Sequence, residues 1–387
     1  MIPRICKLLL TVALLAGCAS TNLQPVTSGA YQPLAEEKRI NLACEQEQQR
    51  LADSEMIYDN RKLTAYLNAV ALKVLPDEAR GKVDIEIIVI NNPYCNAFAY
   101  PNAKVYVHTG ILARMENEAQ LATLLGHEMA HVTHRHMLRE RRSIRNKAAG
   151  LASFKATMGS VPLVGELSSA LGELGTMASV SGYSKELETE ADNIGFEWMV
   201  AAGYDPREAP KLFAHLMAEM EEENREEPFF FGSHPKLQDR QTNYQTCIAA
   251  RGDVTGGVIN RKGYEKAVAP AIYETARLDL KAGRYAKAVK GIQRYLKIYP
   301  RSGRAHYLLG EVYRQRNDGN DLKKAIEFFK RASKLDRKHA ETYRSMGIVY
   351  MSSKDNKAAR RAFQSYLKRA PQAMDREFIQ EYIRQLQ

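Results

Sequence analysis

Residues 121–136 read LATLLGHEMAHVTHRH and contain a His-Glu-x-x-His motif that runs from His127 to His131. On an α-helix, residues four positions apart lie on the same face, one turn above the other. His127 and His131 are therefore expected to bind one metal ion through two imidazole nitrogens. Glu128 follows the first histidine, where its carboxylate would accept a proton from an attacking water. A five-residue motif of this kind can occur by chance. The rest of the chain must therefore supply a helix around the motif and a third ligand before a metal site is predicted.

The residues around the motif predict a long helix. Asn117 is a suitable N-cap, and Glu118 stands in the first turn, where a carboxylate interacts favourably with the helix dipole. Apolar residues then repeat at helical spacing, at Leu121, Leu124, Leu125 and Met129. The motif thus lies within a predicted helix.

A second predicted helix, residues 186–201, offers the missing ligand. It carries Glu188 and Asp192, which are four positions apart and share a face. We expect Glu188 to be the third zinc ligand and Asp192 to accept a hydrogen bond from a ligand imidazole. Glu190 would face away from this site. Such acidic residues are usually solvated, so it is the preceding helical motif that favours a metal site here.

The other histidines near the motif are less suitable as ligands. His134 lies nearly two turns from His127, too far to share one ion with both motif histidines. His136 is expected to point to the opposite face, which predicts a surface or second-layer packing role. Further along the chain, His234 and Arg240 are the best candidates for the donor that stabilises an oxyanion. A structural role for either residue is an equal alternative.

The first residues of the chain predict export. Arg4 and Lys7 form a basic region, residues 8–16 are apolar, and Leu15-Ala16-Gly17-Cys18 follows. This pattern resembles a bacterial lipoprotein signal, so we expect residues 1–17 to be removed and Cys18 to be acylated. An ordinary secretory signal with an accidental cysteine is the alternative. Because residue 19 is Ala rather than Asp, we expect a lipid anchor in the outer membrane, facing the periplasm.

The composition fits a globular protein with two or three domains. No uninterrupted apolar run reaches the ~20 residues that span a bilayer. Cys44, Cys95 and Cys247 remain after the signal, and an oxidising periplasm allows one disulfide among them, without deciding the pair. The absence of a Cys-x-x-Cys pair argues against a cysteine zinc site.

The order of predicted elements indicates an α+β, mostly helical fold with a small sheet. Residues 18–33 are polar with Pro and Gly and predict a flexible tether from the membrane. A catalytic domain would span residues 34–250, with helices in residues 34–75 and strands at residues 83–90 and 104–108. Residues 148–182 would form one or two helices packed on the core, or alternatively a mobile lid over the active site or a patch that touches lipid. Glycine-rich residues 251–264 would form a linker.

Residues 265–387 repeat with the spacing of tetratricopeptide (TPR) helix pairs. Three repeats would cover residues 265–371, and residues 373–387 would form a capping helix. Such arrays form an α-solenoid with a concave groove for a protein partner. From residue 258 onward there are 30 Lys and Arg against 13 Asp and Glu, which favours acidic partners or an anionic membrane surface. Export argues against nucleic acid as the partner.

Several of these motifs together resemble the CAAX prenyl endopeptidase-like zinc metallopeptidases, and most closely their soluble periplasmic BepA/LoiP-type branch. The resemblance rests on Asn96-Ala97-Phe98-Ala99 before Pro101, the helical motif at His127, the Glu188-x-Glu190-Ala191-Asp192-x-x-Gly195 motif, and Ser233-His234-Pro235 with Arg240. It implies a gluzincin fold over about residues 40–250, with one Zn²⁺ per chain. It also implies that Asn96 to Tyr100 lies beside the substrate strand, and that His234 and Arg240 border the active site.

The sequence therefore predicts a lipid-anchored zinc endopeptidase that acts on unfolded or misassembled envelope proteins. Its TPR repeats would recruit the substrate or a partner such as the outer-membrane assembly machinery. The alternative is a chaperone or assembly adaptor in which TPR binding dominates and proteolysis is held off. The intact motif together with Glu188 and Asp192 favours the protease.

Overall fold

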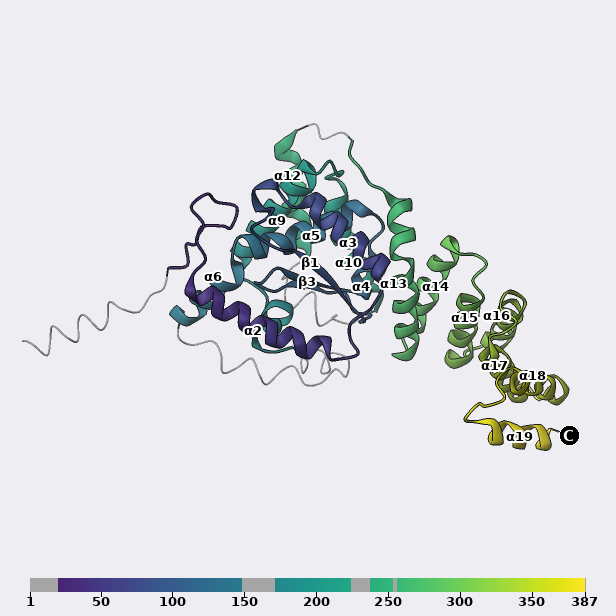
Figure 1. Ribbon diagram of the computed structural model, residues 1–387. Helices are drawn as coiled ribbons and strands as arrows, with labels where there is room; N and C mark the ends of the chain where they lie inside the picture. Colours follow the sequence, from purple (N-terminus) through teal and green to yellow (C-terminus); the bar gives the residue numbers. More distant parts are fainter. Residues whose placement is uncertain (1–19, 148–170, 224–236, 253–255, 387) are drawn as a thin grey trace, which may run out of the picture. The chain divides into compact units, whose positions relative to one another are not determined.

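The computed structural model describes residues 20–147, 171–223, 237–252 and 256–386 (Figure 1). The chain divides into two compact units, residues 1–267 and 268–387, and each is described by itself. The predicted signal, Cys18, His234 and most of the segment 148–182 lie outside the described residues. None of the helices in the described ranges is both long and apolar enough to cross a lipid bilayer.

The first unit is built around a small sheet, which confirms the predicted α+β class. Strand β1 (Glu86–Ile90) pairs in parallel with β3 (Lys104–His108), and β2 (Ala97–Ala99) pairs with β3 in the antiparallel direction. The strand order β1-β3-β2 places β2 at an edge. The two predicted strands are present, although β1 begins three residues later than expected. Strand β2 is too short for its pattern to predict it.

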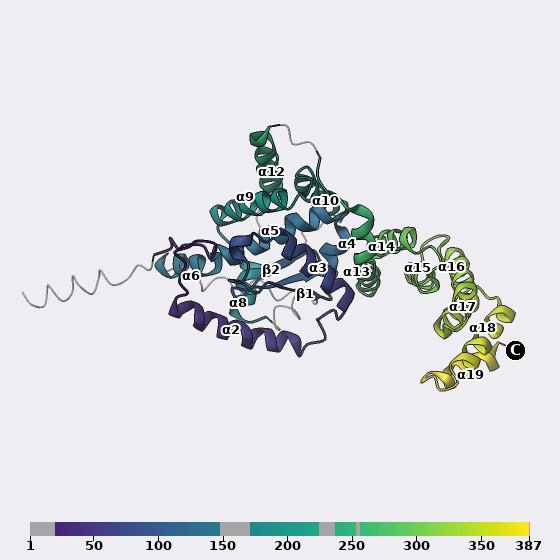
Figure 2. The same cartoon turned by 45° about the horizontal axis from the view of Figure 1, so that its top comes forward.

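Helices lie on both faces of this sheet (Figures 1 and 2). Helix α2 (Ala35–Ala52) packs on the face that carries Tyr106, through a cluster that includes Ile40 and Cys44. Helices α3 (Arg61–Val74) and α5 (Glu118–Thr133) contact the sheet at β1 and β2. The remaining elements of the unit are η1 (Asp77–Ala79), α4 (Thr109–Arg114), α6 (His136–Lys147), α8 (Glu173–Thr176), η3 (Met177–Ser181), α9 (Lys185–Ala201), α10 (Glu208–Glu223) and α12 (Leu237–Arg251).

Two glycines allow the helices α5 and α9 to approach each other closely. A Cβ atom on Gly126 would lie 2.8 Å from the carbonyl oxygen of Gly195. A Cβ atom on Gly195 would lie 2.6 Å from the backbone nitrogen of His127. Both distances are shorter than van der Waals contact, so only glycine fits at either position. The backbones of the two predicted metal-binding helices are therefore in direct contact.

The N-terminal segment is more ordered than the predicted tether. The N–H of Val26 donates to the carbonyl oxygen of Thr133 at 2.7 Å, and Lys82 Nζ donates to the Val26 carbonyl oxygen at 3.3 Å. Arg135 donates to the carbonyl oxygen of Gln24 at 3.1 Å. These contacts hold residues 20–33 against the end of α5, which composition alone does not predict.

Part of the predicted linker is also held in place. The N–H of Val258 donates to the carbonyl oxygen of Gly203, and the N–H of Glu118 donates to that of Ile259. Helix α13 (Arg261–Lys281) begins directly afterwards, and Tyr264 Oη donates to the carbonyl oxygen of Leu112 at 2.7 Å. The boundary between the two units falls inside α13, close to the predicted start of the repeats.

The second unit consists of stacked helix pairs, as the repeat predicts. The helices are the end of α13, α14 (Tyr285–Ile298), α15 (Gly303–Arg316), α16 (Asp321–Leu335), α17 (Ala340–Ser352), α18 (Asn356–Arg369) and α19 (Arg376–Gln385). A Cβ atom on Gly310 would lie 2.5 Å from the Phe329 ring, and one on Gly347 would clash with the Phe363 ring. Small residues at these positions therefore allow the two helices of each pair to pack closely.

The cysteines of the described ranges form no disulfide with one another. Cys44 and Cys95 are buried, and Cys247 is partly buried. Burial raises the pKa of the Cys44 thiol to about 12, so that this thiol stays protonated and unreactive at neutral pH.

Candidate metal centre

The motif helix α5 is fixed at its start and buried along its whole length. The side chain of Asn117 accepts a hydrogen bond from the N–H of Gln120 at 3.0 Å, which confirms the predicted N-cap. Every residue from Glu118 to Thr133 is buried, including the motif histidines and Glu128, which are at most 2% exposed. Ionisable groups at such depth need partners or a metal ion.

His127, His131 and Glu188 come together in one cluster. The two Nε2 atoms of His127 and His131 are 3.0 Å apart. The Glu188 carboxylate lies 3.5 Å from His127 Nε2 and 3.4 Å from His131 Nε2. One ligand atom from each residue lies within 4.8 Å of the others, and all three residues are buried.

This donor set fits zinc. Two imidazole nitrogens and one carboxylate are the protein ligands of many catalytic zinc sites, with a fourth position left for water. Tetrahedral coordination at bond lengths of 2.0–2.1 Å separates neighbouring ligand atoms by about 3.3 Å. The two Nε2 atoms are 3.0 Å apart, and each lies 3.4–3.5 Å from one of the two Glu188 carboxylate oxygens, which is close to this value. These residues would therefore hold Zn²⁺ with little rearrangement.

Asp192 supports the first histidine, as predicted. Its Oδ1 atom lies 2.8 Å from Nδ1 of His127, on the opposite side of the ring from the proposed zinc. Tyr244 Oη donates to the same carboxylate at 2.9 Å. A metal-bound imidazole keeps its proton on the other nitrogen, so Nδ1 donates to Asp192, which fixes the orientation of the ring.

Arg240 lies behind Asp192 and is also buried. Its Nε and Nη2 atoms donate to the two carboxylate oxygens at 3.0 and 2.6 Å. Burial opposes ionisation of Asp192, but Arg240 and His127 together hold the pKa of its carboxyl below the ordinary range. Burial lowers the pKa of His127 to about 4, and the Arg240 charge acts in the same direction. His127 is therefore neutral at pH 7, as a metal ligand must be.

The position of Arg240 supports a role in orienting Asp192 and His127. The roles of Arg240 and His234 as candidate donors to an oxyanion stay predictions, and His234 lies outside the described residues.

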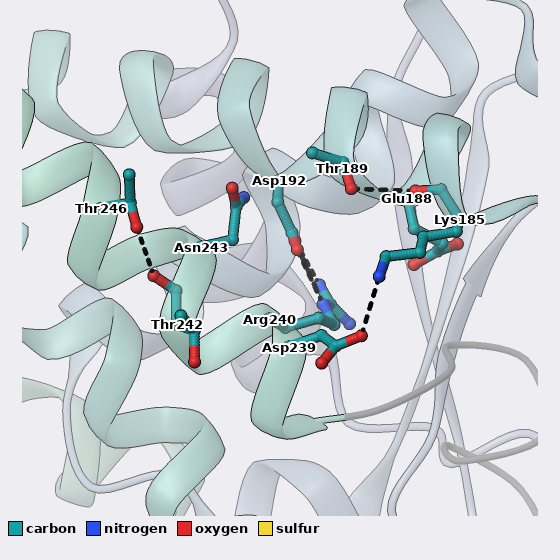
Figure 3. A pocket seen from close by; sticks show the side chains of 9 residues that line it. All are labelled: Lys185, Glu188, Thr189, Asp192, Asp239, Arg240, Thr242, Asn243 and Thr246. Atoms are coloured by element: carbon teal, nitrogen blue, oxygen red, sulfur yellow. Dashed lines mark hydrogen bonds and ion pairs between the residues drawn. The ribbon is translucent and has the colours of Figure 1, made fainter.

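A polar pocket of about 440 Å³ opens beside this cluster, between α9 and α12 (Figure 3). Glu188, Asp192 and Arg240 line it, together with Thr189, Thr242, Asn243 and Thr246. Lys185 and Asp239 form an ion pair at 3.1 Å within it. The pocket gives solvent an approach to the third ligand.

The edge strand β2 lies near the motif helix, with which it is in contact. Its residues Ala97, Phe98 and Ala99 and the preceding Asn96 are all buried. Asn96 Nδ2 donates to the carbonyl oxygen of Ser179 in η3 at 3.2 Å. The segment that contains η3 therefore packs beside the strand predicted to bind substrate.

The structure gives His136 a packing role, one of the two expected alternatives, but does not place it on the face opposite the motif histidines. This residue is 0% exposed, and its Nδ1 atom lies 2.9 Å from Nδ1 of His131. It does not continue α5, because Arg135 adopts a left-handed conformation (φ 60°) and α6 starts in a new direction. Glu190, which was expected to face away from the site, forms an ion pair with Arg139 and lies 3.7 Å from Nε2 of His136. His134 is placed as expected, outside the cluster and beside Trp198.

Comparisons with known proteins agree with this geometry. Residues 61–246 match the family model of peptidase family M48, and residues 273–340 match the tetratricopeptide repeat. The beta-barrel assembly-enhancing protease of Escherichia coli (strain K12) is 26% identical over 293 residues, covering 67% of this chain and 59% of that protein. The same-named protein of Yersinia pestis is 26% identical over 246 residues, covering 60% of this chain and 50% of its own.

A eukaryotic relative matches over a shorter region. The mitochondrial metalloendopeptidase OMA1 of Schizosaccharomyces pombe is 31% identical over 221 residues, covering 54% of this chain and 64% of that protein. The chain thus spans between half and two thirds of the length of these three relatives. The chain therefore contains a domain of peptidase family M48, the zinc metallopeptidase family to which its motif points, followed by tetratricopeptide repeats.

Proposed function

We propose that this protein is a zinc-dependent endopeptidase of the bacterial cell envelope, acting in quality control of misassembled outer-membrane or periplasmic proteins. The observation that carries the proposal is the buried cluster of His127, His131 and Glu188, with Glu128 beside the first ligand. The names of the Escherichia coli and Yersinia pestis relatives support an action linked to β-barrel assembly.

The arrangement of the site accounts for peptide-bond hydrolysis. Bound zinc would supply a Lewis acid that polarises the scissile carbonyl and makes water acidic. Glu128 is 1% exposed, so its carboxylate acts as a general base without competition from bulk solvent. It accepts the proton of the attacking water and delivers it to the leaving amine nitrogen. Asp192 and Arg240 keep the His127 ring in place during these steps.

Substrate would bind as an extended strand along β2. This strand is at the sheet edge, where backbone N–H and C=O groups pair readily with an added peptide. The main chain from Asn96 to Ala99 would hold the peptide, and its hydrogen bonds do not depend on the peptide's sequence. Such recognition suits a protease that acts on unfolded chains of many kinds.

The site of action would be the periplasmic side of the outer membrane. This proposal rests on the lipoprotein signal that ends at Cys18 and on the bacterial relatives. The TPR repeats suit protein–protein interaction. Their basic surface favours an acidic partner, either the substrate or a component of the outer-membrane assembly machinery.

A second candidate function is an assembly adaptor whose proteolysis is held off. One observation favours it: the segment from η3 to Tyr183 packs against the site. Asn96 is hydrogen-bonded to Ser179, and the Tyr183 ring stacks on His131 with centroids 4.1 Å apart. A peptide strand would have to displace these contacts before cleavage.

A Glu128→Gln variant separates the two candidates. The zinc-loaded full chain and the variant are incubated with an unfolded outer-membrane β-barrel protein, and fragments are identified by mass spectrometry. Loss of the general base should slow cleavage by about 10²–10⁴-fold while zinc stays bound. Glu197→Gln, the same change at an exposed residue of α9, should cleave at the wild-type rate. If Glu128→Gln restores envelope integrity to a deletion strain as fully as wild type does, the adaptor role is the main one.

A further inference from the structure

The two proposed zinc histidines are supported in different ways. His127 donates through Nδ1 to Asp192, four positions after Glu188 on α9. For His131, the Nδ1 atom lies 2.9 Å from Nδ1 of another histidine, His136. The two rings are nearly perpendicular, with an interplanar angle of 80° and centroids 4.9 Å apart. In this geometry the Nδ1 atom of one histidine donates a hydrogen bond to the Nδ1 atom of the other.

Zinc binding at His131 determines the direction of this hydrogen bond. If Nε2 of His131 binds the metal, its proton is on Nδ1, which must then donate. Nδ1 of His136 is therefore the acceptor, and the proton of a neutral His136 is on Nε2. That Nε2 atom faces Oε1 of Glu190 at 3.7 Å, slightly beyond hydrogen-bond length. Arg139 holds Glu190 in place with contacts of 2.9 Å.

We propose that His136 is a positioning residue of the zinc site: it accepts the Nδ1–H of His131 and, backed by Glu190 and Arg139, fixes the tautomer and orientation of that ligand. Each zinc histidine then has its own acceptor, Asp192 for His127 and His136 for His131. The inference rests on the proposed zinc site and deepens it.

The backbone break between α5 and α6 makes this contact possible. On a continuous helix, His131 and His136 would point in directions about 140° apart. Arg135 is in the left-handed region with φ 60°, which is unfavourable for a residue with a Cβ atom. Its guanidinium compensates by binding both carboxylate oxygens of Glu37 at 2.7 Å and the carbonyl oxygen of Gln24. The α2 helix and the N-terminal segment thus hold the turn that brings His136 to His131.

Other groups around His136 do not offer the same support to His131. The rings of His134 and Tyr183 have centroids 6.1 Å from that of His136. The Tyr183 ring stacks on the face of the His131 ring, so it does not lie in the ring plane, where Nδ1 of His131 would donate a hydrogen bond.

Zinc affinity of the full chain, measured by competition with a chromogenic chelator, tests the role of His136. His136→Phe fills the space but removes the acceptor and should weaken zinc binding by about 10–100-fold. His136→Asn keeps an acceptor near the Nδ1 position and should restore most of that loss. His134→Phe, the same change two residues earlier, should bind zinc as wild type does. Equal affinity for wild type and His136→Phe, or equal loss in the Phe and Asn variants, would overturn the proposal.

A second measurement uses the wild-type protein and does not depend on variants that fold. In the zinc-loaded chain with ¹⁵N-labelled histidine, NMR should find the proton of His131 on Nδ1 and that of His136 on Nε2. A proton on Nδ1 of His136 contradicts the inference. Failure of the zinc site itself would look different: wild type would hold no stoichiometric zinc, and Glu188→Gln would change nothing.

Discussion

At the scale of single residues, the site depends on a few buried side chains that orient one another. Asp192 is the clearest case, since it contacts His127, Arg240 and Tyr244 at distances between 2.6 and 2.9 Å. It neutralises the buried guanidinium and fixes the imidazole at the same time. Loss of its charge should therefore affect both the metal and the fold.

The substitution Asp192→Asn tests this double role. We expect zinc affinity to fall by about 10–100-fold, because His127 loses its anionic acceptor. We also expect the zinc-free protein to lose roughly 3–5 kcal/mol of unfolding free energy, because Arg240 stays buried without its partner. Chelator competition and urea unfolding measure the two effects. Asp239→Asn, at a half-exposed carboxylate of the same pocket, is the matched control and should change neither quantity.

Residue spacing predicted the ligands but not the contact of His136. His127, His131 and Glu188 follow from the four-residue periodicity of regular helices, and their helices are regular at those positions. The position of His136 depends on the single left-handed residue Arg135, and an arginine gives no signal for that conformation. A glycine at position 135 would have indicated the break. The signal that the sequence does offer for a further residue at the site is the presence of His134 and His136 directly after the motif.

At the scale of elements, the close packing of α5 on α9 brings Glu188 to the two histidines. Gly126 and Gly195 permit the contact. Gly195 ends the motif that begins at Glu188, but the sequence does not predict that either glycine lies where the two helices touch. A glycine inside a predicted helix indicates either a less stable helix or a close approach of another backbone. The sequence of the helix alone does not distinguish these two cases, because the distinction depends on the partner helix. The sequence therefore predicted the two helices but not the glycine pair that joins them.

A Gly195→Ala variant tests the role of this packing. The added methyl would lie 2.6 Å from the backbone nitrogen of His127, so the helices must separate. We expect a loss of about 1–3 kcal/mol in unfolding free energy, as for other overpacked cores, together with weaker zinc binding. Gly29→Ala, where the added methyl meets nothing within 4 Å, should leave both unchanged. Wild-type zinc affinity in Gly195→Ala would show that the helix spacing is not needed.

A separate prediction concerns the turn between α5 and α6 and the stability of variants at Arg135. Arg135→Gly and Arg135→Ala both lose the contacts with Glu37 and Gln24. Glycine adopts φ 60° without strain, whereas alanine does not, so the alanine variant should be the less stable by roughly 1 kcal/mol. Urea unfolding of the two variants side by side measures the difference. Equal stability would mean that the turn relaxes when the guanidinium is removed.

At the scale of the whole molecule, the unit that contains the proposed zinc site is followed by a unit of helix repeats. The helix pairs of the repeat unit were predictable because small and aromatic residues recur at fixed intervals, such as Gly310 with Phe329. The contacts of residues 20–33 were not, since they depend on single hydrogen bonds to a distant helix end.

Zinc removal should therefore act on one unit alone. A ligand held at 1,000 times its dissociation constant stabilises the folded state by about 4 kcal/mol, and a chelator removes that contribution. In hydrogen exchange of the full chain, EDTA should speed exchange in peptides from α5 and α9 and leave those from α15 to α18 unchanged. The His131→Ala variant should exchange equally with and without EDTA. Faster exchange throughout both units would contradict a metal-independent repeat unit.

The measurement that bears most directly on the central claim is the zinc content of the purified full chain, determined by mass spectrometry of the metal. Wild type and Glu128→Gln should each hold one zinc per chain, because Glu128 is a base and not a ligand. Glu188→Gln should lose the metal, since its carboxylate is the third of the clustered ligands. A wild-type chain without stoichiometric zinc, or a Glu188→Gln chain that retains it, would contradict the account.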